Sequence, residues 1–130
     1  MNQNQSILIE AFQSIFEQGQ NDAQQVARYF SKDYHQWVDG HELDFNGFVA
    51  HLKAQRQRIE SVKFTFKSVV EQGDKVATIH LIDAVTKDSH SVKGKVVAQF
   101  TFKDGKITNC EELTYFSEAR EQDRDLGSVS

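Results

Sequence analysis

His80 is the histidine of this sequence whose position best suits an acid/base group. It belongs to an alternating set on one predicted strand, with Val76, Thr78 and Ile82 around His80. Alternate side chains of a strand share a face, and we assign this face to the interior. An imidazole titrates near neutral pH, so His80 could give or take a proton there. The competing interpretation is a core histidine bonded to a neighbouring hydroxyl or backbone carbonyl.

Asp39 is the first candidate partner for His80. It shares its parity with Trp37 on a short aromatic segment, so the two side chains would face the interior together. Asp39 would then lie where that strand ends, at the mouth of a pocket. The competing interpretation is a solvated carboxylate in an Asp39-Gly40 turn. Trp37 is either a core residue or a surface against which a ligand packs.

The last predicted strand supplies a second carboxylate. Glu111 and Glu112 are adjacent, so one should face inward and the other outward. A tight turn before Ile107 would put Glu111 inside. An inward Phe116 instead puts Glu112 inside and requires a bulge between Ile107 and Glu112. We choose Glu112. Unpaired among phenylalanines, its carboxyl would have a raised pKa; paired with His80, it would form the alternative acid/base unit.

The remaining residues do not show the sequence patterns of metal sites, disulfides, phosphate-binding loops or nucleophile elbows. No two histidines have the spacing H-x-x-x-H, so we expect no metal site. The single cysteine, Cys110, rules out an internal disulfide and is interpreted as a small apolar filler. A phosphate-binding glycine loop and a nucleophile elbow are also missing. We therefore predict chemistry without a cofactor.

Composition indicates an ordinary globular chain. Its 130 residues suffice for one domain, with an ordered core at about 6–118 and a tail at 119–130. A net charge of −4 without any basic run argues against nucleic-acid binding. No apolar run could span a bilayer, and no secretory signal is visible. We expect a cytoplasmic protein that does not bind membranes.

Periodic patterns place helices at the front of the chain and strands at the back. Apolar residues spaced by three and four predict helices from Ser6 to Gly19, from Asn21 or Asp22 to Phe30, and from Asp44 to about Ile59. Residues 31–33 are predicted to turn, and residues 34–39 to form a strand. Alternation predicts four further strands, at 62–70, 76–83, 92–102 and 107–116. This order implies a curved sheet wrapped over helices, with a pocket between them.

The order of elements resembles the nuclear transport factor two-like superfamily, also described as SnoaL-like, over roughly residues 6–118. Four short segments match it: Tyr29-Phe30-Ser31-Lys32-Asp33, Leu43-Asp44-Phe45, Phe102-Lys103-Asp104-Gly105-Lys106-Ile107 and Tyr115-Phe116-Ser117-Glu118. The resemblance implies an α+β cone, in which three N-terminal helices pack in the concave face of a strongly curved, mainly antiparallel sheet. These matches are hydrophobic and turn positions, so they support the fold more than any activity.

The resemblance also bears on chemistry. Members of the ketosteroid isomerase type combine a general-base carboxylate with an oxyanion hole made by a tyrosine and a protonated aspartate. By position, those roles fall at or beside Val38, with Asp39 next to it, near Ser14, and on Ala98. Nothing at Ser14 or Ala98 would stabilise an enolate oxygen, so this resemblance disfavours a ketosteroid-type reaction.

The predicted substrate contacts are mainly apolar. They are Trp37, Phe48, Leu52, Phe64, Phe66, Ala98, Phe100 and Phe116. The opposite face of the sheet would expose Ile79, Leu81, Val85, Val97 and Leu113. Such a patch usually marks a partner surface, and the resemblance implies a homodimer through it.

Two functions fit these residues. The first is a cofactor-free enzyme of the cyclase or isomerase type, which would use acid/base chemistry on a small apolar, oxygenated substrate. The alternative is a non-catalytic module that binds an apolar or aromatic ligand, or a dimeric accessory subunit. Polar groups inside an apolar cup carry a desolvation cost, so we favour the enzyme, although the sequence leaves open whether the chain is catalytic.

Overall fold

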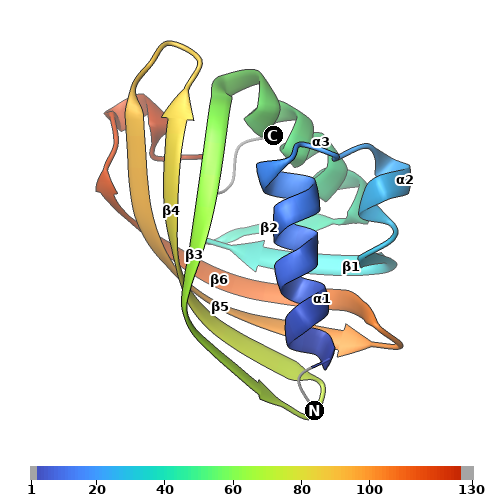
Figure 1. Ribbon diagram of the computed structural model, residues 1–130. Coiled ribbons are helices and arrows are strands. Elements are labelled where there is room, and N and C mark those ends of the chain that lie inside the picture. Colours follow the sequence, from blue (N-terminus) through green and yellow to red (C-terminus); the bar gives the residue numbers. More distant parts are fainter. Residues whose placement is uncertain (1–2, 127–130) are drawn as a thin grey trace.

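The structure, a computed structural model, describes residues 3–126 and consists of one curved sheet with helices on its concave side (Figure 1). The helical elements are α1 (Gln3–Ala11), the π-helix η1 (Phe12–Glu17), α2 (Ala23–Val26), α3 (Phe45–Arg58) and the 3-10 helix η2 (Glu121–Asp123). The strands are β1 (Phe30–Val38), β2 (His41–Asp44), β3 (Ile59–Gln72), β4 (Lys75–Thr86), β5 (Ser91–Lys103) and β6 (Lys106–Glu118).

The sheet has six strands in the order β2-β1-β6-β5-β4-β3. Every neighbouring pair is antiparallel except β1 and β6, which run parallel. The first helix crosses the concave face, and α3 lies beside it toward one end of the sheet (Figure 1). The predicted fold class, a mainly antiparallel α+β cone with helices in its concave face, is therefore confirmed.

Two aspartates begin the second and third helices. Asp22 accepts a hydrogen bond from the backbone N–H of Gln25 at 2.8 Å, and Asp44 accepts one from Gly47 at 2.8 Å. These contacts satisfy backbone donors that a first helical turn leaves unpaired. Helix α2 ends earlier than predicted, because Phe30 already pairs with Ile107 across the sheet. For the same reason, the turn predicted at residues 31–33 is wrong, since these residues belong to β1.

A cluster of aromatic rings joins the first helix to the sheet. The Phe12 ring lies 4.9 to 5.9 Å, centroid to centroid, from its neighbours Phe16, Phe64, Phe66, His80 and Phe100, all in edge-on geometry. Edge-on pairs of this kind stabilise a core beyond the apolar area that they bury. This cluster fixes the distance between the helix and the concave face, and so sets the height of the space between them.

The C-terminal segment packs against the domain instead of leaving it at residue 118. Leu126 is only 4% exposed, in a second small hydrophobic cluster. Asp123 is buried and forms ion pairs with Arg58 at 3.2 Å and with Arg120 at 2.8 Å. Two guanidinium groups compensate the charge that burial would otherwise leave unpaired. Residues 127–130 of the predicted tail lie outside the described residues.

Candidate functional site

A cavity of about 110 Å³ lies between the concave face and the helices. Its wall comes from η1, α3 and all strands except β2, and most of it is apolar. Five of the eight predicted substrate contacts line it: Phe48, Leu52, Phe64, Phe100 and Phe116. The phenylalanine side chains therefore form the wall of the cavity without filling it.

Trp37 does not line the cavity, so the side-chain parity predicted for β1 is wrong. Its side chain is 38% exposed, whereas Tyr34, Gln36 and Val38 are buried and line the cavity. The tyrosine hydroxyl donates a hydrogen bond to Oε1 of Gln36 at 2.8 Å. That bond allows a polar side chain to occupy an inward position, and Trp37 consequently faces the other side of the sheet.

Phe66 and Ala98 belong to the packed core and not to the cavity wall. The Phe66 ring lies against Phe12 and His80, at 5.3 Å from each. Ala98 is 7% exposed and lies on β5 between Thr78 of β4 and Glu112 of β6. Its methyl group is too short to extend beyond these larger neighbours.

His80 has the environment of a core histidine. Its Nδ1 shares a hydrogen bond of 2.9 Å with the hydroxyl of Thr78, and the side chain is 2% exposed. The rings of Phe12, Phe64 and Phe66 surround it at 5.3 to 5.9 Å. Burial lowers the pKa of His80 to about 4, so the imidazole is neutral at physiological pH. His80 nonetheless forms part of the cavity wall.

The predicted pairs of His80 with a carboxylate do not form. In the register of the sheet, His80 is level with Thr114, while Glu112 is level with Thr78. His80 and Glu112 are therefore separated by one intervening strand, β5, and by two residue positions along the strands. Within residues 3–126, no hydrogen bond or ion pair joins His80 to Glu112 or to Asp39. His80 therefore has no carboxylate partner among the described residues.

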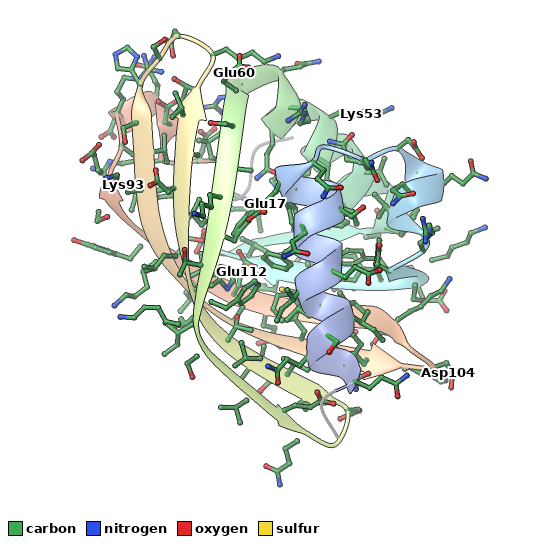
Figure 2. All side chains as sticks on the ribbon, in the orientation of Figure 1. Glu17, Lys53, Glu60, Lys93, Asp104 and Glu112 are labelled. Carbon is green, nitrogen blue, oxygen red and sulfur yellow. The ribbon has the colours of Figure 1, made fainter. Side chains whose placement is uncertain are left out.

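Glu112 (labelled in Figure 2) lines the cavity. The neighbouring Glu111 is exposed. The register explains the choice between them. Phe102 pairs with Ile107, but Thr101 pairs with Asn109, which leaves Thr108 as an extra residue on β6. This bulge reverses the parity of the strand beyond it and turns Glu112 inward.

The carboxyl of Glu112 is held in a poorly solvated place. The pKa of Glu112 is raised to about 7: burial has the largest effect, a hydrogen bond from Cys110 opposes it, and the charge of Asp39 adds a smaller upward contribution. That bond runs from Sγ of Cys110 to Oε1 at 3.5 Å, which is weak. Near neutral pH the carboxyl is therefore present both as a proton donor and as a proton acceptor.

Two further groups beside Glu112 keep their protons. Burial raises the pKa values of Tyr34 and Cys110 well above their ordinary values, and the nearby negative charge of Glu112 adds to both shifts. Both side chains therefore act as neutral donors across the physiological pH range. Of Tyr34, Cys110 and Glu112, only Glu112 titrates near neutrality.

Asp39 does not line the cavity; it lies half-buried in the turn after β1, and its carboxylate is hydrogen-bonded. Its backbone N–H donates to the carbonyl oxygen of Glu112 at 3.1 Å. Its Oδ1 accepts a hydrogen bond from the backbone N–H of Thr114 at 2.7 Å. With φ at +51°, Asp39 adopts the left-handed conformation that aspartate tolerates better than most residues. Asp39 therefore holds β6 in place on both sides of Glu112.

Thr114 is a cavity residue that the sequence did not single out. It follows Glu112 by two residues on the same face of β6 and lines the cavity. Its Oγ1 is the one buried side-chain nitrogen or oxygen atom, among residues 3–126, without a hydrogen-bond partner. The alternation of Cys110, Glu112, Thr114 and Phe116 was the available signal, once the bulge is known.

Two absences concern the described residues alone. No group of three or more histidine, cysteine, aspartate or glutamate side chains in residues 3–126 is arranged to hold a metal ion. No helix in the same part of the chain is long and apolar enough to cross a membrane.

Known proteins share this architecture. A protein of Schizosaccharomyces pombe without a characterised function is 36% identical over 129 residues, which is 99% of each chain. IdmH of Streptomyces antibioticus, a proposed polyketide cyclase, superposes with a TM-score of 0.72 at 14% identity, over 86% of this chain and 91% of that one. An LEH-like epoxide hydrolase of Mycobacterium tuberculosis gives a TM-score of 0.73 at 15% identity, over 88% and 84%. Such identities establish a common fold and no common reaction.

The match at family level covers most of the chain. Residues 9–110 correspond to the SnoaL-like domain, from the first helix to the middle of β6. The cavity, the curved sheet and the helices described above lie mainly in this stretch. The chain therefore belongs to the SnoaL-like domain family.

Proposed function

We propose that the protein is a cofactor-free enzyme of the cyclase or isomerase type, in which Glu112 moves a proton on a small apolar, oxygenated substrate. One observation carries this proposal: among residues 3–126, Glu112 supplies the one carboxyl on the wall of a mainly apolar cavity, and burial raises its pKa to about 7. A carboxylic acid with that pKa is suited to general acid/base work at neutral pH.

The other groups of the wall would bind and orient. The unpaired hydroxyl of Thr114 lies beside Glu112 and would donate to, or accept from, an oxygen-bearing substituent of the substrate. A dry cavity of roughly 150 Å³ admits benzene. This cavity, of about 110 Å³, is smaller, so it would enclose part of a one-ring molecule while the rest of the molecule extends toward the opening. His80, neutral and bonded to Thr78, would shape the wall without exchanging protons.

Proton transfer can be tested without knowing the natural substrate. A panel of one-ring ketones and enones is incubated with the protein in D₂O, and deuterium uptake next to the carbonyl is followed by mass spectrometry. A general base in the cavity accelerates this exchange for the compounds that fit. We expect uptake with the wild type and a loss of at least tenfold in Glu112→Gln, with partial retention in Glu112→Asp.

The matched control is Glu118→Gln, which removes an exposed carboxylate from the same strand and leaves the cavity untouched. It should exchange like the wild type. Equal exchange by E112Q and the wild type, with both variants folded, contradicts the assignment of Glu112 as the base.

A non-catalytic role in binding apolar ligands is the second candidate. The observation that favours it is the hydrogen bond between His80 and Thr78, which engages the imidazole that was predicted to exchange protons in the cavity. The two candidates differ in the same assay. A binding module retains the panel compounds without accelerating their deuterium uptake.

We also propose that two copies pair through the convex face of the sheet. Ile79, Val97 and Leu113 lie next to one another across β4, β5 and β6 and are 38%, 46% and 55% exposed. Along the strands, Lys95 precedes Val97 by two residues on one side of this apolar row, and Glu111 precedes Leu113 by two residues on the opposite side. A second copy turned end for end would bring each lysine opposite a glutamate, as an isologous interface requires.

The pairing is tested by sedimentation at micromolar concentration. We expect a dimer for the wild type, a monomer for Leu113→Asp, and a dimer for Gln57→Asp, an exposed change on α3. A wild type that sediments as a monomer overturns the pairing. The cytoplasmic location stays a prediction from the sequence.

A further inference from the structure

An arginine lies at the rim of the cavity. Arg56 belongs to the last turn of α3, is exposed, and also lines the cavity. Because the same side chain meets both solvent and cavity, the cavity reaches the surface beside Arg56. Within residues 3–126, its guanidinium forms no hydrogen bond and no ion pair. The rim of a mainly apolar cavity thus carries a positive charge that has no partner among these residues.

The chain makes room for this guanidinium. Gly19 has a φ of +71°, and a Cβ at that position would lie 2.7 Å from Cζ of Arg56. Any side chain there would push the guanidinium away from the turn that follows η1. Asn21, which comes two residues later, also lines the cavity and adds a neutral amide to the same rim.

The neighbouring charged and polar groups have partners elsewhere. Glu17, between the first helix and β3 in Figure 2, accepts a hydrogen bond from the backbone N–H of Phe64 at 2.8 Å. Gln55 donates to the carbonyl oxygen of Leu126 at 2.7 Å. Arg58, two residues after Arg56, is tied to Asp123 and Asp125. Arg56 therefore differs from its neighbours in being available to a ligand.

We propose that the cavity takes a carboxylic acid with an apolar body, the carboxylate bound by Arg56 at the rim and the body enclosed by the phenylalanine-rich wall. A planar guanidinium matches a carboxylate through two parallel hydrogen bonds. A single cation suits one negative charge better than the two of a phosphate monoester. This inference rests on the proposed function, because it names the substrate class of the same cavity.

Direct binding of matched ligands tests it. Straight-chain and phenyl-terminated monocarboxylates of increasing length are compared with their primary amides by calorimetry at pH 6, where the ligands are ionised and Glu112 is mostly protonated. We expect at least one acid to bind about tenfold more tightly than its amide, since a charge-assisted hydrogen bond replaces a neutral one. Arg56→Gln should abolish this preference.

The matched control is Lys53→Gln. Lys53 lies on the same helix and points away from the rest of the molecule in Figure 2, so the variant removes an equal charge outside the cavity. It should keep the preference for the acid. Equal binding of acids and amides, or a preference that survives in R56Q, overturns the inference while the apolar pocket stands. Failure of every acid and amide to bind overturns both the inference and the pocket of the proposed function.

Discussion

The backbone N–H of Asp39 donates to the carbonyl oxygen of Glu112 at 3.1 Å. The Asp39 carboxylate also accepts a hydrogen bond from the backbone N–H of Thr114, so one residue beyond the end of β1 holds both sides of Glu112. Asp39 is therefore a positioning residue. It fixes where the Glu112 carboxyl enters the cavity, and its own charge helps to keep that carboxyl protonated.

Replacing Asp39 separates its two effects. Asp39→Asn keeps an oxygen acceptor for Thr114 but removes the charge, so the pKa of Glu112 should fall. Asp39→Ala also removes the acceptor and places alanine in a left-handed conformation, and it should destabilise the fold by about 1 to 3 kcal/mol. Urea unfolding and a pH titration measure the two outcomes. An alanine variant as stable as the wild type would show that Asp39 does not hold β6.

Glu112 should make the protein less stable as the pH rises. Its pKa is about 7 when folded and 4.5 when exposed, so the folded state binds the extra proton between these values. Stability attributable to this group is fully present below pH 4.5 and is lost as the pH rises through 7. E112Q should match the wild type at pH 4 and exceed it at pH 8 by up to roughly 3 kcal/mol.

Urea unfolding at the two pH values measures this difference. Glu118→Gln serves again as the control, because an exposed carboxylate should give no such difference. A wild type and E112Q whose stabilities run parallel from pH 4 to pH 8 would contradict the environment described for Glu112.

His80 should act in the opposite direction. The pKa of His80 is about 4 in the folded protein and 6.5 in the unfolded chain. Acid therefore favours unfolding, because the unfolded chain binds a proton at this imidazole more readily than the folded protein does. Stability from this group is present above pH 6.5 and is lost as the pH falls through 4. The effects of His80 and Glu112 oppose each other between pH 4.5 and 6.5. The contribution of His80 is therefore best measured in the E112Q background. There, His80→Gln should remove the loss of stability that accompanies a fall in pH. If the free energy of unfolding still falls with pH in the His80→Gln variant, that dependence must come from another residue.

Thr114 should matter for the ligand and not for the fold. Thr114→Val replaces an unpaired hydroxyl by a methyl group of similar size, so stability should stay the same or rise slightly. Deuterium exchange of the panel ketones should weaken severalfold, because the substrate loses a hydrogen-bonding group. Thr114→Ser keeps the hydroxyl and should restore most of the exchange. A valine variant with full exchange would assign Thr114 to packing alone.

The sequence predicts the later strands well because their alternation is long. The residues of β4 around His80 and those of β5 around Phe100 repeat often enough to fix which side faces inward. For β6, the inward position of Phe116 required a bulge, and Thr108 provides it. Aspartates 22 and 44 are likewise placed by local chemistry, because a helix cap acts within a few residues.

Alternation does not identify the inward face of the first strand, β1. Both of its faces carry aromatic residues, since Tyr34 faces the cavity and Trp37 is exposed on the other side. Gln36 is buried through a hydrogen bond that only the folded chain forms. The roles of Asp39 and Arg56 depend on partners more than 30 residues away, at Thr114 and Gly19. No local pattern encodes such contacts.

The titration of Glu112 tests the central claim most directly. In protein labelled with ¹³C at the glutamate side-chain carboxyls, NMR follows each carboxyl from pH 3 to pH 9, and E112Q identifies the resonance of Glu112. The account predicts one glutamate carboxyl that titrates near pH 7 and disappears in E112Q. If the Glu112 resonance instead titrates near pH 4.5, like an exposed carboxyl, the proposed acid/base centre of the cavity is wrong.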